Sequence, residues 1–323
     1  MKGSRSKYMI QAGFLILLFC IPLVTNNYEQ YIINLIFVNF LVCLGLAIIL
    51  GFSGQFAFAS AGFLGVGAYT AGLFMVRLGI SYWPALLLSG FVTLVIAVLL
   101  ATIGLRLRRY YLAITTISFT LCMRFFYVNA GKLTLGPSGF NIPHATLFGF
   151  NFNTDHRVYY IVLVVVLLFS VLSWNILRSK IGRAFMAIRD DEEAAAAASI
   201  DVKKYKLLAF AICGVLGGIA GGLYTQVLGR ITPDEFGMLP ILLHFVIVVL
   251  GGLGSFFGLM IATIIVTIIP ELIRAFVEFQ ELLYGAIIVL IILVAPGGIY
   301  GLMLKYSPIR WREKLHGSVE KYS

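Results

Sequence analysis

The sequence predicts an all-α fold, namely a polytopic membrane bundle of about eight to ten transmembrane helices, some of them broken by glycines. The chain is 60% hydrophobic and 12% charged, with a mean hydropathy of +0.98, whereas soluble domains carry about 25% charged residues. Its apolar residues gather in long runs that short polar intervals separate. We expect residues 1–323 to form a single transmembrane domain.

The apolar runs define the candidate spans, because a helix needs about 20 residues to cross the hydrocarbon layer. In chain order they are Tyr8–Thr25, Tyr31–Leu50, Phe56–Val76, Pro84–Leu105, Tyr110–Val128, Val158–Ile176, Leu207–Leu228, Ile241–Gly254, Gly258–Phe276 and Leu282–Leu304. The third run is rich in glycine and the eighth is short, so either could fall short of a simple span. The first run resembles a signal peptide, but no small-x-small cleavage site follows it, so we expect a retained span.

The distribution of basic residues predicts the orientation. With the N-terminus inside and each run crossing once, the inside segments hold 18 of the 24 Lys and Arg residues. Positive charge favours the cytoplasmic side. Both termini and the polar segment 177–206 are therefore expected in the cytoplasm, and this clustering between spans argues against a nucleic-acid-binding surface.

The segment 177–206 is the longest polar interval with apolar runs on both sides. It has no Pro, and no Gly after Gly182, and it is rich in good helix formers, so we expect one helix over Arg183–Ala198. Asp190 to Glu193 precede five alanines, at a place where acids favour a helix N-terminus. The alanines predict a smooth surface that fits closely into a groove on another protein.

Two glycine-broken heptapeptides, Leu50–Phe56 and Leu250–Phe256, both read L-G-x-x-G-polar-F. Paired glycine-broken segments in two halves of a membrane protein indicate a pathway near the membrane midplane. The alternative is chance, since glycine is common in membrane helices. The residues that we expect along such a pathway are Ser53, Gly54, Gln55, Ser60, Tyr69, Gly251, Gly252 and Gly254.

Four ionisable residues lie within or near the spans. Charge inside a membrane is costly, so Arg124, Glu271 and Arg274 are expected to reach toward the interface, and the last two can pair three residues apart on one helix. His244 is expected to hydrogen-bond to a neighbouring helix. No nucleotide-binding or catalytic motif and no metal-ligand spacing is present in the sequence, so we expect no enzyme, catalytic residue, metal or cofactor.

The stretch Gly182–Phe210, GRAFMAIRDDEEAAAAASIDVKKYKLLAF, resembles the cytoplasmic EAA coupling loop of ABC importer permeases. More narrowly, it resembles the LivM-type permease subunit of branched-chain amino acid transporters. Further similar motifs are Gly54–Tyr69, Leu105–Arg124, Gly251–Ser255 and Ala295–Ile299, so the resemblance spans almost the whole chain. The chain departs from the pattern at Ser199, where the family usually has glycine, and it lacks a common serine within Phe56–Ala59.

The resemblance implies a multi-pass permease subunit of the bacterial cytoplasmic (inner) membrane, which moves branched-chain amino acids by alternating access. Its implied partners are a homologous LivH-type permease, two cytoplasmic ATPases that use ATP and Mg²⁺, and an extracytoplasmic substrate-binding protein. The coupling residues that it implies are Arg183, Ala187, Arg189, Asp191, Glu192, Glu193, Ala194, Ala195 and Ser199. Three alternatives remain at this point: a urea or short-amide importer permease, a gradient-driven secondary carrier, and a membrane protein with a structural role.

Overall fold

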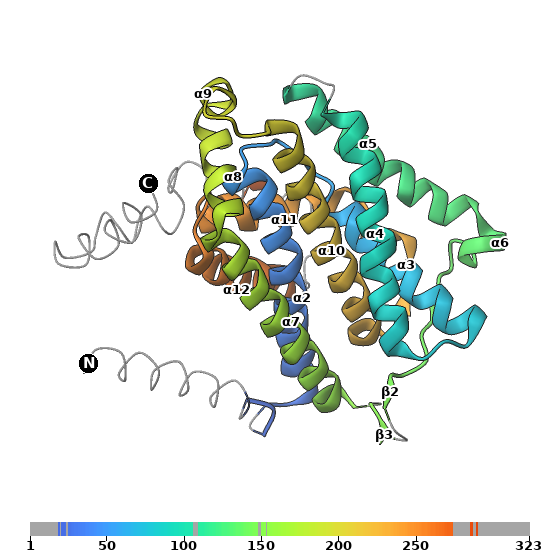
Figure 1. Ribbon diagram of the computed structural model, residues 1–323. Coiled ribbons are helices and arrows are strands. Elements are labelled where there is room, and N and C mark those ends of the chain that lie inside the picture. The colour runs from blue at the N-terminus through green and yellow to red at the C-terminus, as the bar shows by residue number, and fades with distance from the viewer. Residues whose placement is uncertain are drawn as a thin grey trace, which may run out of the picture.

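The computed structural model describes residues 21–273 except 24, 106–108, 148–149 and 153, together with positions 19, 285, 286 and 289. Its six longest helices are α2 (Asn27–Ala47), α3 (Ser60–Leu78), α4 (Tyr82–Gly104), α5 (Arg109–Asn129), α7 (Asp155–Arg178) and α10 (Val202–Leu228). The other helices are η1 (Ile21–Leu23), η2 (Ile48–Phe52), α6 (Gly131–Thr134), α8 (Lys180–Asp190), α9 (Glu192–Ala197), η3 (Pro233–Phe236), α11 (Met238–Gly251) and α12 (Phe256–Ile273). Figure 1 shows them as one bundle.

The six longest helices are each long and apolar enough to cross a membrane. Each contains most of one predicted run, including the glycine-rich run Phe56–Val76, whose helix α3 has 19 residues. The run Ile241–Gly254 forms α11, which has 14 residues. Nearly all of Tyr8–Thr25 and Leu282–Leu304 lies outside the described residues, as do both termini. The described part therefore confirms the all-α bundle and leaves its total number of spans as a prediction.

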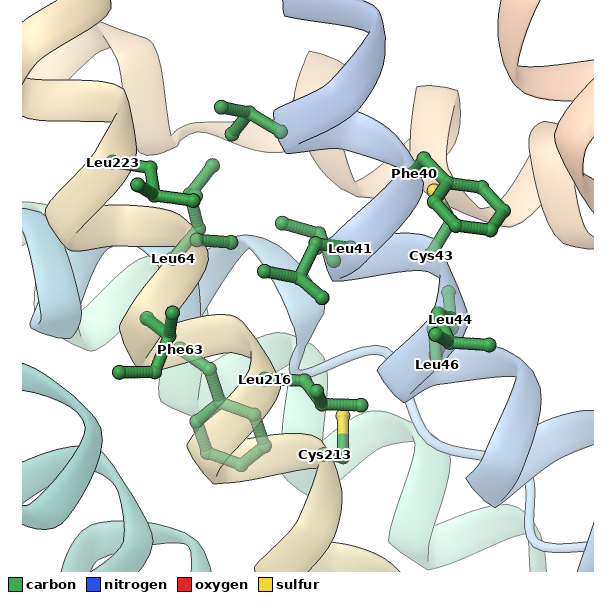
Figure 2. Packing of buried hydrophobic residues seen from close by; sticks show 14 of the residues in the cluster. Phe40, Leu41, Cys43, Leu44, Leu46, Phe63, Leu64, Cys213, Leu216 and Leu223 are labelled. Atoms are coloured by element: carbon green, nitrogen blue, oxygen red, sulfur yellow. The ribbon is translucent and has the colours of Figure 1, made fainter. Parts of the chain in front are cut away.

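Helix α10 lies at the centre of the bundle and packs against α2, α3 and α4. Figure 2 shows Leu41 of α2, Leu64 of α3 and Leu216 of α10 in the space where the helices meet. Within lipid, burying such side chains gains little from the hydrophobic effect, so close packing supplies the attraction. Small residues permit it: an ideal Cβ built on Gly67 would lie 2.3 Å from the carbonyl oxygen of Gly218.

The two ends of the bundle differ in structure. One end carries two short antiparallel pairs, β1 (Phe140–Asn141) with β4 (Arg230–Ile231) and β2 (Thr146–Leu147) with β3 (Phe150–Asn151). The opposite end carries α8, α9 and the start of α10 (Figure 1). The predicted orientation requires the segments 51–55, 177–206 and 255–257 to lie on one side of the membrane. At this second end, Arg189 of the segment 177–206 contacts Gly51 and Gly254, and Gly254 directly precedes the segment 255–257.

Candidate functional site

The candidate site is the region where α8 meets two glycine turns, Gly51–Gln55 and Gly251–Ser255, with α9 joined to the first turn through α10. We call it the loop junction. It begins where α7 turns sharply into α8: the Ser179 hydroxyl accepts a hydrogen bond from the Ile181 N–H at 3.1 Å and so caps α8. An ideal Cβ on Gly182 would lie 1.9 Å from the Leu177 carbonyl oxygen. Only glycine fits this turn, which therefore joins α8 tightly to α7.

The single helix predicted over Arg183–Ala198 is wrong, because the structure has two helices there with a break at Asp191. Asp191 has an extended backbone, with φ −157° and ψ 116°. Its carboxylate accepts hydrogen bonds from the N–H groups of Glu193 and Ala194, at 2.8 and 3.0 Å. This N-cap offers the backbone an alternative to continuing the helix, and it leaves the acids in the first turn of α9, as expected from the helix dipole.

Helix α9 presents a small, smooth surface. Ala194, Ala196, Ala197 and Ala198 are exposed, together with Glu193. Ala195, which we expected on the same surface, is only 3% exposed and packs inside this chain. After α9 comes Ser199, whose φ of 65° lies in the left-handed region, where serine is more strained than glycine.

Helix α8 is amphipathic and buries Gly182, Ala184, Phe185 and Ile188. Arg183 and Arg189 are exposed on α8, and Ala187 is half-buried. The coupling candidates therefore lie on a folded surface whose apolar side is fixed to the bundle.

Arg189 connects α8 to both glycine turns. Its Nη1 atom donates a hydrogen bond to the Gly51 carbonyl oxygen at 2.8 Å. An ideal Cβ on Gly254 would lie 3.3 Å from the same Nη1 atom, and one on Gly54 would lie 3.1 Å from Arg189 Cα. The turns also meet each other, since an ideal Cβ on Gly51 would lie 2.9 Å from the Gly254 nitrogen. The two similar heptapeptides are thus neighbours in space, with Arg189 against both.

A second connection runs from α9 to the first glycine turn through α10. Glu192 forms an ion pair with Lys206, with 2.6 Å between Oε2 and Nζ. The Gln55 amide lies 3.4 Å from the Lys206 carbonyl oxygen and donates to the Ser53 hydroxyl at 2.8 Å. Ser53 and Gln55 are both buried. Each of the two loop helices is therefore tied to the turn that follows α2.

Ser60 and Tyr69 lie outside the loop junction, on α3. The Ser60 hydroxyl is 3.2 Å from Nδ1 of His244 on α11, which confirms that His244 hydrogen-bonds to a neighbouring helix. Tyr69 stacks on Tyr127 of α5 at 3.9 Å between ring centroids. The predicted pathway residues thus divide between the junction and α3, where Ser60 is the first residue and Tyr69 lies in the middle. Their place on a pathway stays a prediction.

Arg124 is held by an ion pair rather than by simply extending to the interface. Its Nη2 atom lies 2.7 Å from Oδ1 of Asp234 in η3, so it ties α5 to the loop before α11. The side chain of Glu271 and all of Arg274 lie outside the described residues, so their predicted pairing is not tested.

The contacts of Lys206 and Arg189 at the junction were not predicted from the sequence. Lys206 was only part of the segment similar to the coupling loop, and Arg189 was expected only as a coupling residue. The repeat of L-G-x-x-G was the available signal, because two glycine turns that pack together leave room for one long side chain from a third segment.

The match to a family profile described as "Branched-chain amino acid transport system / permease component" covers residues 30–295. The chain is 31% identical over 322 residues to the high-affinity branched-chain amino acid transport system permease protein LivM of Escherichia coli K12, covering 92% of this chain and 76% of the relative. It is 29% identical over 281 residues to LivH of the same organism, covering 81% and 90%. A fructose import permease protein, FrcC of Rhizobium meliloti, is 27% identical over 157 residues, covering 46% and 43%.

No solved structure matches the chain. Transport permease relatives and six helices that can span a membrane identify a multi-pass protein of the inner membrane. With most of its length matched by the profile and by LivM, the chain belongs to the family of permease components of branched-chain amino acid transport systems.

Proposed function

We propose that this chain is the transmembrane permease subunit of an ATP-binding-cassette importer for branched-chain amino acids. The observation that carries the proposal is the similarity to a LivM protein over 92% of the chain. The chain is also similar to LivH, which supports a complex in which two homologous permeases form the membrane part. Neither ATP nor Mg²⁺ would bind to this chain; two ATPase partners would use them, and an extracytoplasmic binding protein would deliver the amino acid.

The loop junction is the part of the chain suited to receive force from the ATPases. Helix α9 offers exposed small side chains, over which a groove on a partner can close without steric conflict. Glu193 and the capping carboxylate of Asp191 add negative charge beside these alanines, which favours a basic groove. A short, rigid docking helix transmits displacement better than a mobile loop, because it moves as one body.

Displacement of α8 and α9 would reach the spans through three firm connections. The α7–α8 turn is fixed by Ser179 and Gly182. The start of α10 is capped by Asp201, whose carboxylate accepts from the Lys204 N–H at 3.1 Å. Arg189 reaches the turn after α2. Closure of the ATPases on ATP would thus shift the equilibrium between two arrangements of the bundle, which is alternating access.

The test is ATP-dependent uptake of labelled leucine by right-side-out membrane vesicles, or by proteoliposomes, that are loaded with ATP and contain this chain, its second permease and the ATPases, with the binding protein added outside. Excess isoleucine and valine are expected to compete. Uptake of urea instead of leucine would keep the ABC architecture and refute the amino acid substrate. Leucine uptake that persists without the ATPases would refute the importer mechanism in favour of a gradient-driven carrier.

A further inference from the structure

We infer that Arg189 is a positioning residue that holds the coupling segment to the ends of α2–η2 and α11 together, and that its guanidinium is directed at these helix ends rather than at an ATPase. This inference rests on the proposed function, because it assigns a task to one residue of the proposed coupling loop.

Arg189 contacts the carbonyl end of η2 and the glycine turn that follows α11. The π-helix η2, which continues α2, ends at Phe52, and α11 ends at Gly251. The last carbonyl groups of a helix carry partial negative charge and lack partners within the helix. The Arg189 guanidinium donates to one of them, the Gly51 carbonyl, at 2.8 Å. A cation with several donors in a rigid plane is well suited to such a place.

Glycine provides the space for the arginine on both sides. Gly54 has a φ of +67°, and an ideal Cβ there would lie 3.1 Å from both Cα and Cγ of Arg189. Gly254 has a φ of +93°, and an ideal Cβ there would lie 3.3 Å from Nη1. A side chain at either position would have to share the space that the arginine uses. The two glycine turns therefore leave between them a space that a single side chain, that of Arg189, occupies.

The competing acidic partner is weak. Oδ1 of Asp190 lies 3.9 Å from Nε of Arg189, and the two side chains are 77% and 42% exposed. Exposed ion pairs at this separation contribute little. Because the Gly51 and Gly254 backbones are also in contact with each other, a shift of α8 carried by Arg189 moves the ends of α2 and α11 as a pair. Each of these two helices leads into one copy of the repeated heptapeptide, α2–η2 into Leu50–Phe56 and α11 into Leu250–Phe256.

The experiment uses the complete importer in proteoliposomes, with Arg189→Gln, Arg189→Lys and the control Lys203→Gln. Lys203 is exposed near the start of α10, so the control removes one positive charge from the same side of the protein. Three quantities are measured on each preparation: ATPase retained on the affinity-purified permease, ATP hydrolysed, and labelled leucine taken up per ATP.

Arg189→Gln is expected to retain the ATPases and to hydrolyse ATP, while leucine taken up per ATP falls about tenfold or more, because a charged hydrogen bond is lost. Arg189→Lys is expected to recover part of the ratio, since an ammonium still stands at the helix ends but lacks the planar fork. Lys203→Gln is expected to match the unmodified importer.

Loss of the ATPases from both Arg189 variants would overturn the inference, because it would place the guanidinium on the partner. An unchanged amount of leucine taken up per ATP in Arg189→Gln would overturn it too. If Arg189→Gln does not accumulate in the membrane, Arg189→Lys alone decides. A partial loss of leucine taken up per ATP in Arg189→Lys then supports the inference, and an unchanged value refutes it. Absence of ATP-dependent leucine uptake by the unmodified importer would refute the proposed function instead, so the two failures are distinct.

Discussion

Replacing Gly67 by valine tests the packing of α3 on α10. An ideal Cβ at Gly67 would lie 2.3 Å from the oxygen, 2.6 Å from Cα and 2.8 Å from the carbonyl carbon of Gly218. All three are backbone atoms, so no side-chain rotation relieves the contact. An ordinary carbon–oxygen contact is about 3.3 Å or more, and the two helices would have to separate locally by about 1 Å.

The valine would destabilise the folded protein because it overpacks a close contact. Overpacking lowers the free energy of unfolding by about 1–3 kcal/mol per site, and by more when backbone must move. Valine is a few tenths of a kcal/mol better than glycine in a helix, which offsets little of this. We therefore expect a net loss of about 2 kcal/mol, which lowers the unfolding midpoint by several degrees, roughly 4 °C for a chain of this size.

The assay is the fraction of monodisperse protein after heating in detergent, measured by size-exclusion chromatography at one heating rate for all variants. Gly285→Val is the matched control, because Gly285 is helical and an ideal Cβ there has no neighbour within 4 Å among the described residues. Its midpoint is expected to stay unchanged. If Gly67→Val were as stable as this control, the close approach of α3 and α10 would be refuted.

Three further substitutions probe the two ends of the bundle. Glu193→Lys reverses an exposed charge on α9 and is expected to abolish ATP-dependent uptake without changing the amount of protein in the membrane; normal uptake would refute the role of α9. Gly54→Leu is expected to displace Arg189 and to lower uptake at least about tenfold, and normal uptake would refute the contact. Arg124→Gln breaks an exposed ion pair with Asp234 and is expected to change stability by less than about 1 kcal/mol in thermal unfolding; a larger loss would mean that the pair is buried in the assembled importer.

The spans were predictable because the length and composition of apolar runs suffice to identify them. The runs Pro84–Leu105 and Leu207–Leu228 became α4 and α10 with shifts of a few residues at their ends. The packing order was not predictable, since within lipid the faces of a helix do not differ in polarity as they do in water. Glycines such as Gly218 mark close contacts in the sequence, but they do not say with which helix.

The break at Asp191 was missed because Arg183–Ala198 is rich in good helix formers, which outweighed the poor helix formers Asp190 and Asp191. A strong N-cap can divide such a stretch, and Asp191 followed by two glutamates was the available signal. The meeting of Gly51 with Gly254 depends on pairing across about 200 residues, which local pattern cannot supply. The repeated heptapeptide indicated that the two segments are alike, and the structure adds that they touch.

The most direct test of the coupling account is photo-crosslinking from α9 in the assembled importer. A photoreactive amino acid is placed at Ala196, which is exposed on α9, and, as a control, at Thr146, which is exposed in β2 at the opposite end of the bundle. The account predicts a crosslink to an ATPase subunit from position 196 and none from position 146. A crosslink to the ATPase from position 146, with none from position 196, would contradict it.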